Sequence, residues 1–239
     1  MRLRALIFDV DGTLADTEEA HRQAFNAAFQ DRGLEWRWSV PQYARLLSIT
    51  GGKERLRAYI DSLPLWPTER RSLVARIPDI HAAKTALYAR SLERGSVQLR
   101  EGIERLLQAA EDAGIRLAIA STTTRANIEA LLRATLGAAS MRRFAAVAAG
   151  DDVPRKKPSP DVYRCVLRAL DLPAADCVAV EDSAVGLQAA KAAGLYTVVT
   201  PSQWTKDEDF AQADWIVPSF AACERPLKEI ESRGQSGEP

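Results

Sequence analysis

The fold is indicated most clearly by the stretch ALIFDVDGT at residues 5–13. Its first four residues form a short, continuous apolar run, which is typical of a parallel-sheet strand covered on both faces. Two carboxylates, Asp9 and Asp11, follow directly, and Gly12 permits the chain to turn there. Paired carboxylates at a strand end can divide the roles of nucleophile and general acid/base. A solvent-exposed turn is the alternative, because Asp and Gly are common turn residues.

Five further apolar runs resemble the first, and helical patterns separate most of them. The runs cover residues 117–120, 144–149, 177–180, 196–199 and 215–217. The helical patterns cover residues 102–114, 126–136, 160–170 and 184–193. Strands that alternate with helices predict right-handed βαβ crossovers, and therefore an α/β fold with a Rossmann-like, doubly wound parallel sheet.

One long segment breaks this alternation, because it contains helical patterns and no strand. Thr17 is expected to cap its first helix and Ser39 to open its second. We therefore predict a core domain at residues 1–15 and 97–231, with an inserted α-helical cap domain at residues 16–96. An insertion after the first strand belongs at the carboxyl edge of the sheet, where α/β proteins bind their ligands. Residues 232–239 are expected to form a disordered tail.

Composition excludes several classes of protein. The 239 residues include 32 Lys and Arg and 32 Asp and Glu, so zero net charge argues against binding of nucleic acid or an anionic membrane through bulk positive charge. Three cysteines without a C-x-x-C pair and only two histidines argue against a disulfide framework or a zinc site. The first residues pass directly into a strand pattern, so we expect no secretory signal peptide. No apolar run is long enough to span a bilayer. We expect a cytoplasmic monomer with a small-molecule substrate.

Polar groups follow three more of the predicted strands. Ser121 follows one strand, Lys157 lies in the loop after the next, and Glu181-Asp182 follows a third. Because the carboxyl ends of parallel strands face one crevice, these groups are expected to converge with Asp9 and Asp11. Each has a structural alternative: Ser121 as a helix cap, Lys157 as a solvated charge, and the acidic pair as the start of a helix. Polar groups at four separate strand ends favour a functional site over four unrelated structural roles.

This set of residues resembles the four motifs of the haloacid dehalogenase superfamily. The resemblance covers the whole chain and implies that Asp9 attacks phosphorus to form an aspartyl-phosphate, while Asp11 acts as the general acid and base. It further implies that Ser121 and Lys157 bind the transferring phosphoryl group, and that Thr122 contacts the substrate. The implied cofactor is Mg²⁺, held by Asp9, the backbone carbonyl of Asp11 and Asp182, with Glu181 further from the metal.

The inserted helical block resembles the cap of the β-phosphoglucomutase-like subgroup, and in more detail that of Rubisco-associated sugar bisphosphate phosphatases of the Calvin cycle. The latter resemblance implies a substrate such as xylulose 1,5-bisphosphate, hydrolysed to xylulose 5-phosphate. Its implied substrate contacts are Glu18, His21, Tyr43, Gly51, Gly52, Lys53 and Arg55. Two glycines before a helix can turn their N–H groups toward a phosphate, and Lys53 and Arg55 add positive charge. A plain linker with solvated charges is the alternative, and Trp36 and Trp38 are expected to pack in the core.

Three other functions remain open at this point. A phosphosugar mutase of the β-phosphoglucomutase type uses the same aspartyl-phosphate but returns the phosphoryl group to a sugar. A receiver-like signalling domain also gathers Asp, Ser or Thr, and Lys at strand ends, but it needs neither the large helical insert nor a second Asp two residues after the first. An inactive binding relative is disfavoured because every catalytic motif is intact.

Overall fold

The computed structural model describes residues 2–236 and divides into two compact units. Unit 1 combines the residues up to Asp16 with those from Val97 onward, and unit 2 comprises Thr17–Ser96. Asp16 therefore lies with unit 1 rather than with the helical segment, where the sequence placed it. No helix among residues 2–236 combines the length and the apolar character needed to cross a membrane.

Unit 1 is built on a six-stranded parallel sheet with the order β3-β2-β1-β4-β5-β6. The strands are β1 Ala5–Phe8, β2 Arg116–Ala120, β3 Phe144–Ala148, β4 Cys177–Glu181, β5 Tyr196–Val199 and β6 Trp215–Ile216. The first strand of the chain therefore lies inside the sheet, with β2 on one side and β4 on the other. This arrangement confirms the predicted α/β, doubly wound fold.

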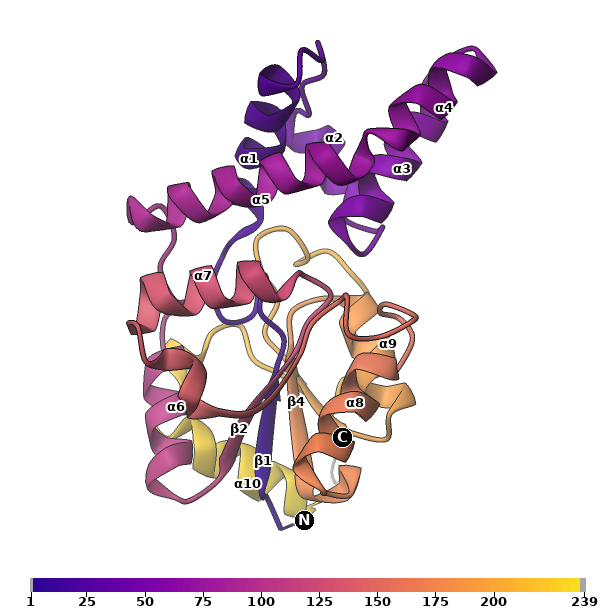
Figure 1. Cartoon of the computed structure of the whole chain (residues 1–239). Coiled ribbons are helices and arrows are strands. Elements are labelled where there is room, and N and C mark those ends of the chain that lie inside the picture. The colour runs from indigo at the N-terminus through magenta and orange to yellow at the C-terminus, as the bar shows by residue number, and fades with distance from the viewer. Residues whose placement is uncertain (1, 237–239) are drawn as a thin grey trace. The chain divides into compact units, whose positions relative to one another are not determined.

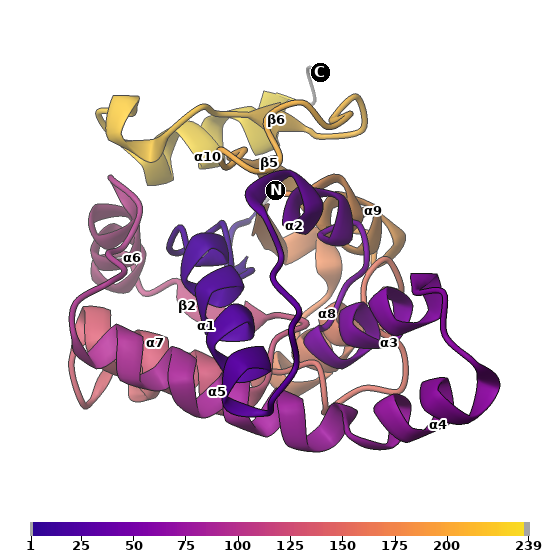
Figure 2. The same ribbon diagram turned by 90° about the horizontal axis from the view of Figure 1, so that it is seen from above.

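Helices cover both faces of this sheet (Figure 1). They are α6 Ile103–Asp112, α7 Arg125–Leu136, α8 Asp161–Leu170, α9 Ala184–Ala192 and α10 Pro226–Ser236. Alternate residues of β1, such as Ala5 and Ile7, pack in one core cluster with Val162, Tyr163 and Val166 of α8. Helices α8 and α9 lie on one side of the sheet, and α6 lies on the other with α10 beside it (Figure 2). Burial on both faces explains why the strands are continuous apolar runs.

Unit 2 consists of helices, as the sequence pattern indicates. They are α1 Glu18–Asp31, α2 Val40–Leu46, α3 Gly52–Ser62, α4 Pro67–Ala75 and α5 Ile77–Glu93. Trp38 is fully buried, and its ring centroid lies 4.8 Å from that of Phe25 and 4.9 Å from that of Phe29. Trp36 meets the Phe29 ring edge-on at 5.4 Å. The core role expected for Trp38 is confirmed, whereas Trp36 is only partly buried at the edge of the same aromatic group.

Two local expectations are wrong. Thr17 precedes α1, but its side chain makes no capping hydrogen bond and is fully buried. Helix α10 extends through residues 232–236, which were expected in a disordered tail, because Leu227 and Ile230 are buried and the helix contacts α6. Residues 237–239 lie outside the described residues.

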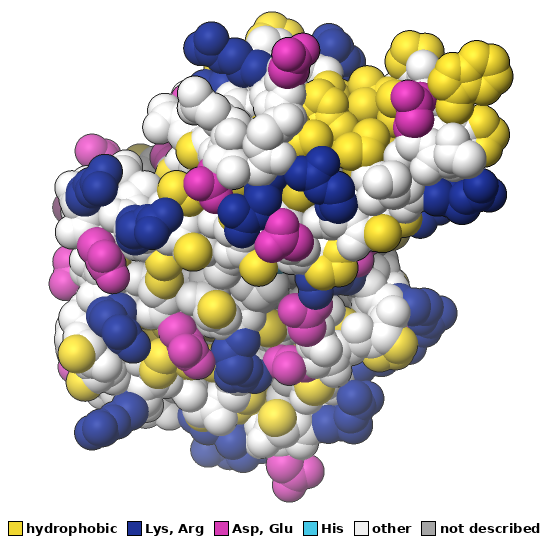
Figure 3. All heavy atoms as spheres, turned by 45° about the horizontal axis from the view of Figure 1, so that its top comes forward, with side chains coloured by type: hydrophobic (Ala, Val, Ile, Leu, Met, Phe, Trp, Pro, Cys, Tyr) yellow, Lys and Arg dark blue, Asp and Glu magenta, His cyan; other side chains and the backbone are white. Residues whose placement is uncertain are grey.

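Surface charge follows the balanced composition. Basic and acidic side chains are interspersed on the face seen in Figure 3, which also carries a group of hydrophobic side chains. The most exposed large hydrophobic side chain among the described residues is Trp66, at 76% exposure. No large surface of one charge sign is visible on this face.

Candidate active site

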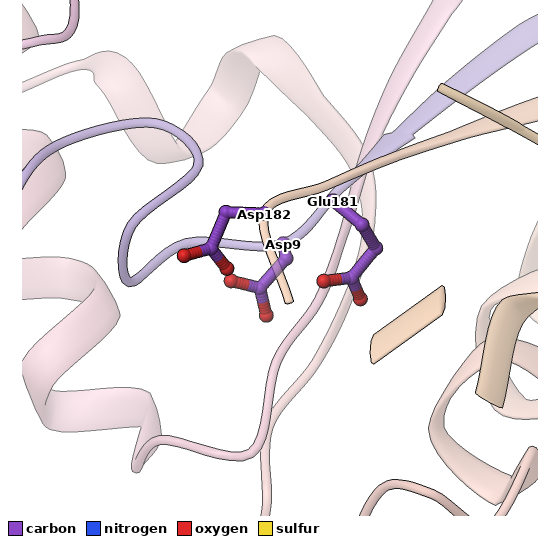
Figure 4. Close-up of side chains that lie close together, drawn as sticks. All are labelled: Asp9, Glu181 and Asp182. Atoms are coloured by element: carbon purple, nitrogen blue, oxygen red, sulfur yellow. The ribbon is translucent and has the colours of Figure 1, made fainter. Parts of the chain in front are cut away.

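The ends of β1 and β4 bring three carboxylates together. Phe8 and Val180 are paired in register, and the Asp9 N–H donates to the Val180 carbonyl at 3.0 Å. Asp9 therefore emerges beside Glu181 and Asp182, and all three side chains are buried. One carboxylate oxygen from each lies within 4.8 Å of the others, and Figure 4 shows the three side chains grouped around one space. The predicted convergence of these two strand ends is observed.

Lys157 reaches this acidic cluster from the loop between β3 and α8. Its Nζ donates to Asp9 Oδ1 and to Glu181 Oε1, each at 2.6 Å, and its side chain is only 4% exposed. Burial lowers the pKa of this ammonium, but the adjacent carboxylates of Asp9 and Glu181 outweigh burial and raise it above its usual range. Lys157 is therefore a buried, permanently charged group and not the solvated surface lysine of the alternative interpretation.

Tyr163 is a member of the cluster that the sequence did not reveal. It lies in the first turn of α8, is fully buried, and donates its hydroxyl to Glu181 Oε1. The Lys157 Nζ lies 5.1 Å from the centroid of the Tyr163 ring. One signal could have found this residue, since a tyrosine on the buried face of an amphipathic helix needs a partner for its hydroxyl.

The donor set suits a divalent cation. Burial raises the pKa of Asp9 to about 8, the nearby Lys157 ammonium opposes the rise, and the negative charge of Glu181 adds to it. Glu181 Oε2 is buried and has no hydrogen-bond partner among the described residues. Clustered, desolvated carboxylate oxygens are the ligands that hard cations prefer. A bound cation would favour the ionised form of Asp9.

Two neighbouring loops approach Asp182 closely. Thr205 Oγ1 donates to the Asp182 carbonyl at 2.7 Å and lies 3.3 Å from Asp182 Oδ2. On the other side lies Gly12, whose φ is +87°, and a Cβ built there would come within 2.1 Å of Asp182 Oδ2. Only glycine adopts this φ without strain and leaves room for the carboxylate.

Arg100 connects the loops around Gly12 and is another residue that the sequence did not reveal. Its guanidinium donates to the carbonyls of Gly12 and Thr200 at 2.6 Å and of Pro201 at 2.8 Å. The side chain also lies 3.8 Å from the Asp16 carboxylate. Arginine suits this position because its planar fork offers several donors at once.

The other expected residues of unit 1 also follow strand ends. Asp11 is partly exposed in the turn after β1, and its side chain is not among the grouped carboxylates. Ser121 is buried directly after β2, where its Oγ accepts from the Thr123 N–H at 3.3 Å. Thr122 is partly buried, and Gly150 of the next loop approaches its carbonyl so closely that a Cβ would lie 2.1 Å away. Because β2 pairs with β1, Ser121 and Thr122 share the carboxyl edge with Asp9.

In unit 2, three of the expected substrate contacts form one hydrogen-bonded group. Tyr43 is fully buried, and its hydroxyl donates to Glu18 Oε2 at 2.8 Å and accepts from Arg55 Nη1 at 2.9 Å. Arg55 also donates to the carbonyls of Leu46 and Ile49. Its guanidinium is therefore engaged inside unit 2, and it differs from the exposed Lys53 that was grouped with it.

His21 lies in a second buried group of unit 2. Its Nδ1 is 2.7 Å from Lys84 Nζ, and its ring stacks on Tyr88 with centroids 3.9 Å apart. His21 and Lys84 are each 4% exposed, so neither is a surface residue. A lysine ammonium donates but cannot accept, so Nδ1 of His21 is the acceptor from an ammonium at this distance. Lys84 is a residue that sequence reasoning missed.

The two glycines expected to bind phosphate open α3. Gly51 has φ +92° and is the N-cap, and Gly52 begins the helix. A Cβ on Gly52 would lie 2.5 Å from Nε2 of the buried His81, another residue that the sequence did not single out. Lys53 is exposed in the first helical turn. The N-terminus of a helix favours a bound anion through its backbone dipoles.

Comparison with known proteins identifies relatives along nearly the whole chain. A family model described as a haloacid dehalogenase-like hydrolase matches residues 3–194. Protein CbbY of Rhodobacter capsulatus is 50% identical over 223 residues, which cover 93% of this chain and 96% of that protein.

Two solved structures of CbbY from Rhodobacter sphaeroides are similar to this chain. One, in complex with phosphate, has a TM-score of 0.85 and 47% identity, and the match covers 93% of this chain and 96% of that chain. The other is a mutant in complex with xylulose-(1,5)bisphosphate, with a TM-score of 0.86, 46% identity and the same coverage. The resemblance noted from the helical insert is thus matched by similarity of both sequence and fold.

Proposed function

The chain belongs to the haloacid dehalogenase-like hydrolases and is a phosphatase enzyme, and we propose that it hydrolyses xylulose 1,5-bisphosphate to xylulose 5-phosphate and inorganic phosphate. The observation that carries this proposal is the buried Lys157–Asp9 ion pair beside the carboxylates of Glu181 and Asp182. This arrangement offers a carboxylate nucleophile and a fixed positive charge for phosphoryl oxygens. The bisphosphate bound to a mutant of the similar CbbY supports the choice of substrate.

In the first half of the proposed reaction, an Asp9 oxygen attacks phosphorus and the bond from phosphorus to the sugar oxygen breaks. Asp11 gives its proton to the departing oxygen, so the sugar leaves as a neutral alcohol. In the second half, Asp11 takes a proton from water as the water oxygen attacks the phosphorus of the aspartyl-phosphate. The bond between phosphorus and Asp9 then breaks, which releases phosphate and restores both carboxyl groups.

The other core residues bind and orient the transferring group. Lys157 and Ser121 would hold equatorial phosphoryl oxygens, whose charge dominates phosphoryl transfer. Asp9, Asp182 and the Asp11 carbonyl would hold Mg²⁺, while Glu181 would stand further back because its Oε1 already accepts from Lys157 and Tyr163. When bound, Mg²⁺ supplies positive charge to the phosphoryl oxygens and favours the ionised form of Asp9.

Unit 2 would provide the contacts that select a bisphosphate. The N–H groups after Gly51 and the exposed Lys53 would bind the second phosphate. Glu18, Tyr43 and Arg55 form a buried polar group, and His21 is held by Lys84. Such fixed donors and acceptors could distinguish the hydroxyl configuration of xylulose from that of ribulose 1,5-bisphosphate, because a buried group left unpaired costs about 1–3 kcal/mol.

The test is phosphate release from sugar mono- and bisphosphates by the purified protein with Mg²⁺. We expect the highest kcat/KM for xylulose 1,5-bisphosphate. A higher kcat/KM for glucose 1-phosphate, or for another monophosphate, would contradict the proposed substrate. Formation of glucose 6-phosphate from β-glucose 1-phosphate would instead identify a mutase.

Lys53→Met tests the second phosphate site, and Arg57→Met is its matched control because both residues are exposed cations of α3. We expect Lys53→Met to raise KM for the bisphosphate about tenfold, a loss of roughly 1.4 kcal/mol, and to leave KM for a monophosphate unchanged. Arg57→Met should leave both values unchanged. Equal effects of the two variants would reject Lys53 as a specific phosphate contact.

A further inference from the structure

Tyr163 touches the acidic cluster in two different ways. Its hydroxyl donates to Glu181 Oε1, and its ring lies 5.1 Å from the Lys157 ammonium that contacts the same oxygen. Glu181 Oε1 therefore accepts from both Lys157 and Tyr163, whereas Asp9 Oδ1 accepts from Lys157. All four side chains are buried, so their contacts are not exchanged with bulk water.

The two donors on Glu181 Oε1 compete for the same negative charge. A hydroxyl that donates to a carboxylate oxygen stabilises its charge and weakens the attraction of that oxygen for a second donor. If the hydroxyl were absent, Glu181 would neutralise its buried charge through Lys157 alone. The ammonium would then be drawn toward Glu181 and away from Asp9, where the phosphoryl group is to be bound.

We propose that Tyr163 is a positioning residue, whose hydroxyl sets how the Lys157 ammonium is shared between Glu181 and Asp9 and thereby sets the affinity for the transferring phosphoryl group. This inference rests on the proposed function, in which Lys157 binds phosphoryl oxygens. The hydroxyl itself makes no contact with the reacting atoms in this role. It acts through Glu181, and the ring contributes separately by its contact with the ammonium.

Tyr163→Phe removes the hydroxyl and retains the ring. The matched control is Tyr196→Phe, because Tyr196 lies in the same unit and its buried hydroxyl has no hydrogen-bond partner among the described residues. The probe is inorganic phosphate, titrated calorimetrically in the presence of Mg²⁺, so the result does not depend on which sugar the enzyme hydrolyses. We expect Tyr163→Phe to raise the phosphate Kd about tenfold, as loss of one charge-assisted hydrogen bond would. Tyr196→Phe should stay within about twofold of the parent.

The second measurement asks whether Tyr163 acts through Glu181. In a Glu181→Gln background the carboxylate charge is gone, so adding Tyr163→Phe should change the phosphate Kd by less than about twofold. Additive losses in the double variant would overturn the proposal, as would an unchanged Kd in Tyr163→Phe or an equal change in Tyr196→Phe. A Tyr163→Phe protein that fails to fold would also overturn it, because the hydroxyl would then serve the fold. Failure of the parent to hydrolyse any sugar bisphosphate would refute the proposed substrate instead.

Discussion

Replacing Gly12 by alanine should lower both the stability of the protein and its catalytic rate, for two different physical reasons. Gly12 has φ +87°, and the added Cβ would lie 2.1 Å from Asp182 Oδ2, whereas ordinary contact begins at 3.4 Å. The carboxylate must therefore move by about 1 Å, and a displacement of that size in a reacting centre can cost roughly a hundredfold in rate. The left-handed conformation itself costs an alanine about 1–2 kcal/mol of stability.

Gly137→Ala provides the matched control. Gly137 has φ +88°, and a Cβ at that position meets nothing within 4 Å. Urea unfolding should show a loss of stability of about 1–3 kcal/mol in both variants, because φ is positive at both positions. Only Gly12→Ala should also lose about a hundredfold in kcat/KM and need more Mg²⁺ for half-maximal activity. If Gly12→Ala remained as active as Gly137→Ala, the close approach of Gly12 to Asp182 would not matter for catalysis.

Three other predictions concern the carboxylates. Asp9→Asn should fold but lose a factor of about 10⁴ or more in kcat, and turnover within tenfold of the parent would rule out Asp9 as the nucleophile. Asp182→Ala should raise the Mg²⁺ concentration for half-maximal activity more than Glu181→Ala does, because Glu181 is already engaged by Lys157 and Tyr163. Equal increases in that Mg²⁺ concentration, or full activity in excess EDTA, would contradict the metal assignment. Burial raises the pKa of Asp9 from 3.8 to about 8, so the folded chain keeps a proton that the unfolded chain loses. In EDTA, the free energy of unfolding should therefore fall as the pH rises between these two values. Mg²⁺ or the Asp9→Asn substitution should make this fall smaller. A free energy of unfolding that rises with pH in the parent but not in Asp9→Asn would refute the raised pKa.

The strands could be predicted from the sequence because of how they are buried. All four residues of β1 are fully buried, and β4 is buried along its whole length, so each appears as an uninterrupted apolar run. Helix α10 could not be predicted in the same way. Its described side chains are buried at only three positions, Pro226, Leu227 and Ile230. Its contact with α6 comes from tertiary packing that a local pattern does not contain.

In the candidate site, too, some residues could be predicted from the sequence and others could not. Asp9, Glu181 and Asp182 could be predicted to converge because parallel strands end at one edge and the residues follow those ends directly. Tyr163 and Arg100 could not, because their partners are 18 and 84 or more residues away and neither residue lies at a strand end. Lys84 was missed because a lysine on a helix is ordinarily a surface residue. Its burial beside His21 depends on the packing of α5 on α1.

The place of β1 inside the sheet also determines the order in which the site can assemble during synthesis. Asp9 leaves the ribosome before the residues that surround it, because the strand before it pairs with residues 116–120 and 177–181. The helices of unit 2 form a compact unit from residues 17–96 and can fold while the nucleophile still has no sheet around it. A ribosome-bound chain that ends before residue 177 can therefore contain a folded helical unit, but it holds Asp9 without Lys157 and Glu181 in place, and so without a catalytic centre.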